Sequence, residues 1–71
     1  YNIVETAVRN RVTQVLLVHN HPDGDPTPSD QDVYYTNCIY KALKGVGITL
    51  KDHYVIGSYP LSMVKNGYLN L

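Results

Sequence analysis

Residues 13–19 have the sequence Thr-Gln-Val-Leu-Leu-Val-His, which is β-branched and aliphatic with no polar alternation. Such a run favours a strand covered on both faces, as in the parallel or mixed sheet of an α/β protein. The next nine residues, Asn-His-Pro-Asp-Gly-Asp-Pro-Thr-Pro, contain three prolines and a glycine, which exclude a helix or a central strand. We therefore expect a buried strand that ends in an ordered surface loop.

A helix is expected directly after this loop, over residues 30–44. Ser29 is a good N-cap, and Asp30 and Asp32 lie in the first turn, where the helix dipole favours acidic groups. Gly45 stands where a glycine commonly ends a helix. Helical spacing predicts a mostly apolar face made of Val33, Thr36, Ile39, Tyr40, Ala42 and Leu43.

Three further elements complete the predicted order of helix, strand, loop, helix, strand and hairpin. Asn2 and Glu5 have the spacing of a capping box, so residues 3–11 are predicted to form a short first helix. A second strand is expected around residues 52–56. The turn signal Asn66-Gly67 predicts a hairpin between residues 61–65 and 68–71.

Length and charge limit the function classes. The 71 residues weigh 8.0 kDa and allow one domain, 1–71, and the start at Tyr1 suggests that it is part of a larger one. Six basic residues balance six acidic ones, and the basic residues are scattered along the chain. Because nonspecific nucleic-acid binding depends on clustered Lys and Arg, direct DNA binding by this segment is not expected.

Location is predicted from the cysteine content and from the length of the apolar runs. Cys38 is the only cysteine, so it forms no intramolecular disulfide, and a free thiol fits a reducing compartment. The longest aliphatic run, residues 15–18, is far shorter than the roughly 20 residues of a membrane span. We expect a cytoplasmic protein with no membrane partner, in which Cys38 is an inert, partly buried thiol.

His19, His21 and Asp32 have the spacing of a metal site. Residues two apart on a strand project from the same face, so the two imidazoles can converge on one ion. Asp32 begins the helix after the proline-rich loop, which can fold back to bring the carboxylate beside them. Two imidazoles and a carboxylate make a zinc site with an open fourth position, as in catalytic zinc enzymes, although the same donors also suit iron or manganese.

These residues resemble the JAMM metalloproteases, also called MPN+ or JAB proteins. Their signature, H-x-H-P, six residues, then S-x-x-D, is matched without a gap by residues 19–32. The strings HNHPDGDPTPS and GITLKDHYVIG are similar to the bacterial RadC branch, historically labelled DNA repair proteins. The resemblance implies a mixed sheet flanked by helices in a cytidine-deaminase-like architecture, zinc held by His19, His21 and Asp32, an oxyanion contact from Ser29, and hydrolysis of peptide or isopeptide bonds.

One part of the family pattern is not matched. The general base of the family is a glutamate on a strand before the first helix, whereas the only glutamate here is Glu5. We interpret Glu5 as part of the capping box and expect the catalytic glutamate to lie outside this chain, with missing N-terminal strands. Without its base, the isolated segment would be slowed by about 10²–10⁴-fold. An exposed sheet edge would also favour self-association.

Other polar residues and other functions stay as alternatives. Asp23 and Asp25 are interpreted as turn residues, and one of Asp52 and His53 as solvent-facing or structural, because neighbours on a strand face opposite sides. A non-catalytic interaction module in a DNA-repair or mobile-element setting is the main alternative function. Direct DNA binding rests on the family label alone. The substrate stays undetermined.

Overall fold

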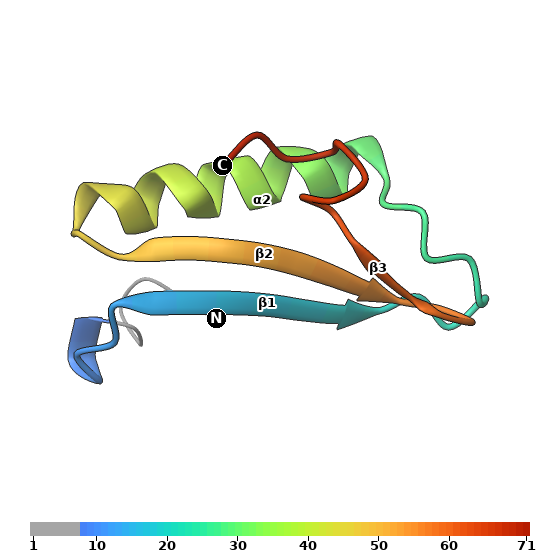
Figure 1. Ribbon diagram of the computed structural model, residues 1–71, viewed down its shortest axis with the longest axis horizontal. Helices are drawn as coiled ribbons and strands as arrows, with labels where there is room; N and C mark the ends of the chain where they lie inside the picture. Colours follow the sequence, from blue (N-terminus) through green and yellow to red (C-terminus); the bar gives the residue numbers. More distant parts are fainter. Residues whose placement is uncertain (1–7) are drawn as a thin grey trace.

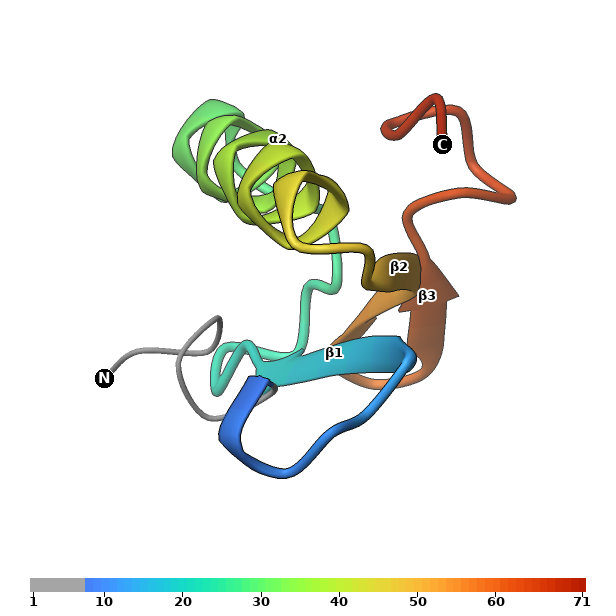
Figure 2. The same ribbon diagram turned by 90° about the vertical axis from the view of Figure 1, so that its left-hand side faces the viewer.

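The computed structural model describes residues 8–71, which form one helix against a three-stranded mixed sheet (Figure 1). The elements are β1 (Gln14–Asn20), α2 (Asp30–Gly45), β2 (Thr49–Ile56) and β3 (Pro60–Ser62). The strand order is β1-β2-β3, with β1 parallel to β2 and β3 antiparallel to β2. Because α2 is the crossover between the two parallel strands, it lies over one face of the sheet (Figure 2). The predicted α/β class is confirmed.

The first predicted helix, residues 3–11, lies largely outside the described residues, as do Asn2 and Glu5. Val8 and Arg9 are helical. Among residues 8–71, no helix is long and apolar enough to cross a bilayer.

Helix α2 begins as predicted and extends one residue further than predicted. Ser29 is its N-cap, and the turn that ends it has Val46 as C-cap. The glycine with positive φ is Gly47 (77°), whose N–H donates to the Lys44 carbonyl at 3.1 Å. Gly47, and not Gly45, is therefore the glycine that the end of the helix requires.

An irregular register between β1 and β2 controls which side chains face α2. Val15 pairs with Leu50, whereas the next residue, Leu16, pairs with Asp52, so Lys51 is an extra residue in β2. Leu50 packs against Leu43 of α2. The bulge at Lys51 interrupts the alternation that would otherwise turn residue 53 away from the helix, and it places His53 on the helix side.

Two apolar clusters lie between the helix and the sheet. The first, called the Leu43 cluster, has Leu43, Ile48 and Leu50 at its centre and includes Val15, Leu17, Ile39 and Tyr40. The second, called the Met63 cluster, joins β2 and β3 to the C-terminal segment through Val55, Leu61, Met63 and Leu69, with Val33 and Val64 against it. Thr36 and His53 lie between the two clusters along α2 and β2.

Strand β1 is covered on one face only in the part of the chain that the structure describes. Val15 and Leu17 pack toward α2, whereas Leu16 and Val18 are 55% and 59% exposed. The expectation of a strand buried on both faces is wrong here because the only described helix against this sheet lies on one side of it. Cys38 is exposed, so the expected partly buried thiol is also wrong.

The predicted C-terminal hairpin around Asn66-Gly67 is wrong. β3 ends at Ser62, and the chain then forms turns in which Tyr68 and Leu69 both donate to the Met63 carbonyl. The cause is the buried carboxylate of Asp52, which accepts hydrogen bonds from the Ser62 hydroxyl and from the Val64 backbone at 3.1 Å. The backbone N–H of Val64 is thereby removed from any strand ladder.

Candidate metal centre

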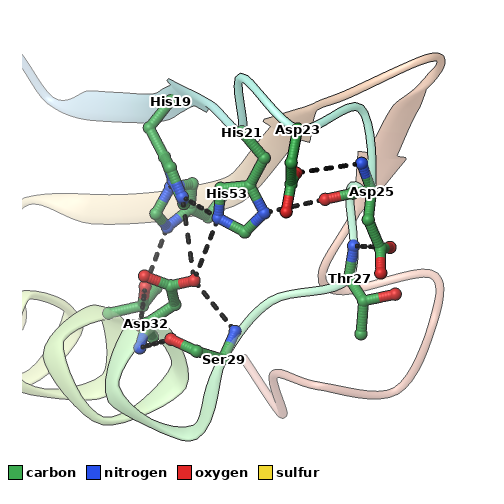
Figure 3. A network of polar contacts seen from close by, with 9 residues as sticks. His19, His21, Asp23, Asp25, Thr27, Ser29, Asp32 and His53 are labelled. Atoms are coloured by element: carbon green, nitrogen blue, oxygen red, sulfur yellow. Dashed lines mark hydrogen bonds and ion pairs between the residues drawn. The ribbon is translucent and has the colours of Figure 1, made fainter.

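Three donor atoms converge where the end of β1 meets the start of α2 (Figure 3). His19 Nε2 lies 2.9 Å from His21 Nε2, and Asp32 Oδ2 lies 3.8 and 3.3 Å from these two nitrogens. With metal–nitrogen bonds of about 2.0–2.1 Å, two donors of a tetrahedral zinc site stand about 3.3–3.4 Å apart. The three separations, from 2.9 to 3.8 Å, lie on both sides of this value, and the chemistry of the set fits zinc.

The two histidines are presented by the end of β1 and by the backbone beyond it. The backbone N–H of His21 donates to the Ile56 carbonyl of β2 at 2.9 Å, which extends the parallel pairing past Asn20. As predicted from their spacing, His19 and His21 project from the same face. Both side chains are partly exposed.

The proline-rich loop fixes the orientation of the His21 ring. His21 Nδ1 lies 2.9 Å from the backbone carbonyl of Asp25. Asp23 accepts from the Asp25 N–H, and Asp25 accepts from the Thr27 N–H, which confirms that these acids act as turn residues. The hydrogen bonds from Thr27 hold the pKa of Asp25 below its usual value.

Gly57 allows this loop to lie against the end of β2. A Cβ atom on Gly57 would lie 2.5 Å from the Gly24 carbonyl oxygen and 2.8 Å from the Pro26 nitrogen. The Ser58 N–H donates to the same Gly24 carbonyl at 2.7 Å. Only a residue without a side chain leaves room for both contacts, so Gly57 supports the loop that carries His21.

Asp32 is held by the capping box of α2. Its Oδ2 accepts from the Ser29 backbone at 2.9 Å, and its own N–H donates to Ser29 Oγ at 3.0 Å. Partial burial favours the protonated acid, but the hydrogen bonds from Ser29 and the nearby histidines outweigh it and lower the pKa of Asp32. The carboxylate is thus kept ionised and aimed at the imidazoles.

Ser29 lies at this site as the N-cap of α2. Its Oγ accepts one hydrogen bond, from Asp32, and a hydroxyl also carries one hydrogen of its own to donate. Its expected contact with an oxyanion stays a prediction.

His53 and Thr36 are site residues that the sequence reasoning missed. His53 Nε2 lies 2.7 Å from His19 Nδ1, and His53 Nδ1 lies 2.8 Å from Thr36 Oγ1. Burial, together with the neighbouring His19, lowers the pKa of His53 and favours its neutral form. One signal was available: Thr36 follows Asp32 by one helical turn on the same face.

Asp52 and His53 are both buried, so of the two expected roles, solvent-facing or structural, neither residue has the solvent-facing one. They do leave β2 in different directions, since Asp52 contacts the turn after β3 and His53 contacts α2. Asp52 is structural, as the alternative interpretation had it, and the two side chains form no catalytic dyad.

Comparison with known proteins agrees with this geometry. A family model described as a RadC-like JAB domain matches residues 1–68. A UPF0758 protein of Ruegeria pomeroyi is 44% identical over 68 residues, which is 94% of this chain and 30% of that protein. A UPF0758 protein of Syntrophomonas wolfei is 46% identical over 63 residues, or 89% of this chain and 27% of its own length. The chain thus spans less than a third of these relatives.

Proposed function

Because the chain belongs to the RadC-like JAB domain family, we propose that His19, His21 and Asp32 bind a zinc ion and that the protein hydrolyses peptide or isopeptide bonds. The convergence of three donor atoms, 2.9 to 3.8 Å apart, carries this proposal. When bound, zinc supplies a Lewis acid and lowers the pKa of a coordinated water to about 7.

The chain's own residues would hold and orient the reacting groups. The two imidazoles and the ionised Asp32 would provide three ligands, which leaves a fourth position of a four-coordinate zinc ion for water or substrate. Ser29 has a hydroxyl hydrogen that can be directed at the oxygen of an amide carbonyl as negative charge develops on it. Proton transfer requires a base, and the only glutamate of the sequence is Glu5, which lies outside the described residues.

A metal-binding experiment tests the proposal most directly. The protein should retain about one zinc ion per chain after dialysis, measured by elemental analysis, and His21→Ala and Asp32→Ala should each lose it. Asp30→Asn is the matched control, because Asp30 is an acid in the same helical turn but is not a member of the donor group. Equal zinc content in all four proteins, or none in the parent, would exclude the site.

The hydrolase activity needs its own measurement. Purified protein loaded with zinc should cleave peptide or isopeptide substrates about 10²–10⁴-fold more slowly than a family member whose site holds the glutamate base, and a chelator should abolish the cleavage. Asp32→Ala should be inactive at the same protein concentration. Cleavage that persists in Asp32→Ala would identify a contaminant.

A non-catalytic interaction module is the second candidate, and the exposed apolar side chains of β1 favour it. Leu16 and Val18 leave a non-polar surface on the sheet face opposite α2. Zinc-dependent cleavage of any substrate would count against a purely non-catalytic role.

Direct nucleic-acid binding is not part of the proposal, since the basic residues are few and scattered. Salt-sensitive affinity for DNA in the absence of metal would contradict this exclusion.

A cytoplasmic location is also part of the proposal. The exposed thiol of Cys38 would stay reduced in that compartment. Fractionation of cells that produce the protein tests the location.

A further inference from the structure

We propose that Thr36 and His53 form an ordered hydrogen-bond relay that fixes the tautomer of His19, so that its Nε2 lone pair points at the metal. The relay runs from the backbone of α2 through two buried side chains to the far nitrogen of the His19 ring. The inference rests on the proposed function for the role of His19 as a ligand. It makes Thr36 and His53 positioning residues.

The direction of the relay is set at its helix end. Thr36 Oγ1 lies 2.7 Å from the backbone carbonyl of Asp32, one turn earlier in α2. A carbonyl oxygen can only accept, so the hydroxyl hydrogen of Thr36 is committed to it. Since a hydroxyl has one hydrogen, Thr36 Oγ1 can act toward any other group only as an acceptor.

The tautomer of His53 follows from this restriction. His53 Nδ1 lies 2.8 Å from Thr36 Oγ1 and must therefore carry a hydrogen and donate it. In a neutral imidazole the other nitrogen then has a lone pair. That nitrogen, His53 Nε2, lies 2.7 Å from His19 Nδ1, so it accepts the hydrogen bond and His19 Nδ1 donates.

The last step leaves the lone pair of His19 on Nε2, at the donor cluster. His21 reaches the same state by a different route, because its Nδ1 donates to the Asp25 carbonyl. Two lone pairs then face each other across 2.9 Å, with an Asp32 oxygen 3.3 Å from one of them. Such an arrangement of acceptors is favourable only around a cation.

Burial makes the relay hard to replace. Thr36 is 1% exposed and His53 is 9% exposed, so water has little access to complete a broken link. A buried donor or acceptor without a partner costs about 1–3 kcal/mol, which favours the arrangement in which the polar atoms of Thr36 and His53 are all paired. Among the described residues, no buried side-chain nitrogen or oxygen lacks a partner.

The test compares Thr36→Val, which has nearly the same shape and no hydroxyl, with Thr36→Ser, which keeps the hydroxyl. ¹⁵N NMR of metal-free protein at neutral pH reports which ring nitrogen of each histidine carries hydrogen. We expect the Nδ1–H form of His19 in the wild type and in Thr36→Ser, and a mixture with the Nε2–H form in Thr36→Val. Zinc affinity, measured by competition with a chelator, should fall about 10–100-fold in Thr36→Val and stay close to wild type in Thr36→Ser.

Two results would overturn the relay. One is an NMR spectrum of the wild type in which His19 carries its hydrogen on Nε2. This result would reject the relay even if Thr36→Val does not fold. The other is a folded Thr36→Val protein with the wild-type tautomer and zinc affinity. Because the NMR readout needs no metal, a wild type with the expected tautomer and no zinc binding would reject the proposed function and retain the relay.

Discussion

The contacts between α2 and the sheet are of two kinds that lie side by side. The Leu43 cluster is apolar throughout, and its stabilising energy depends on area and fit. The line from Thr36 through His53 to His19 is polar, and each member depends on the direction of its neighbour's hydrogen bond. The comparison indicates that the Leu43 cluster holds α2 against the sheet, whereas the hydrogen bonds from Thr36 to His19 orient the side chains of the candidate metal centre at the start of α2.

The largest effect is expected from Leu43→Ala, which tests the cluster side of the comparison. Leu43 is fully buried, so truncation should lower the free energy of unfolding by about 2–5 kcal/mol through lost burial and a cavity. Urea unfolding measures this loss. At temperatures where the variant stays folded, its zinc affinity should match the wild type; a large loss of affinity would show that the two regions are not separable.

Removal of the metal tests the other region of the comparison, the candidate metal centre. Zinc at 100 times its dissociation constant should stabilise the folded chain by about 2.7 kcal/mol, because it binds the folded state only. Thermal unfolding with and without a chelator measures the shift. Asp32→Ala should show no shift, and an unchanged melting temperature in the wild type would argue against a site assembled by folding.

Gly57→Ala should have an intermediate effect. The added Cβ would collide with the backbone of the loop that carries His21, so we expect a loss of about 1–3 kcal/mol in stability and weaker zinc binding. Gly45→Ala is the control, since its Cβ would meet nothing within 4 Å. Equal stability and affinity in both variants would mean that the loop is not held by this contact.

Ser29 allows the capping role to be separated from the chemical role, with a smaller effect on stability. Ser29→Ala should lose about 1 kcal/mol, and Ser29→Gly only a few tenths, because glycine is a tolerated N-cap. Both lack the hydroxyl, so both should lose hydrolysis by about 10²–10³-fold if Ser29 contacts the oxyanion. Rates that follow stability would assign Ser29 to capping alone.

The smallest change in stability is expected from Leu16→Lys, within about 0.5 kcal/mol, because the side chain is exposed. Among the described residues, β1 pairs with β2 only, which leaves one strand edge open beside a non-polar face. We therefore expect concentration-dependent self-association of the wild type in sedimentation experiments and less of it in Leu16→Lys. A wild-type monomer at all concentrations would contradict this.

Local signals predicted most of the fold and most of the site. The Ser29 cap, the periodicity of α2 and the aliphatic run of β1 act within a few residues, and the structure has these elements within one residue of their predicted ends. The convergence of His19, His21 and Asp32 followed from strand spacing and a helix start. The long-range contacts were missed: His53 meets His19 across 34 positions, and Asp52 turns the chain after Ser62 across ten.

The extra residue at Lys51 gives a criterion for comparing relatives. Plain alternation over the same residues of β2, without a bulge, would turn the residues after Lys51, including His53, to the opposite side, whereas a strand that lacks position 51 would alternate regularly and keep them on their present sides. Another family member can have a histidine at the position of His53. That identity alone is therefore not enough to infer that this histidine contacts the first metal ligand, as His53 contacts His19 here. The number of residues between the last apolar contact of the strand and that histidine shows whether a bulge is needed: two residues, as between Leu50 and His53, need one, whereas a single residue does not.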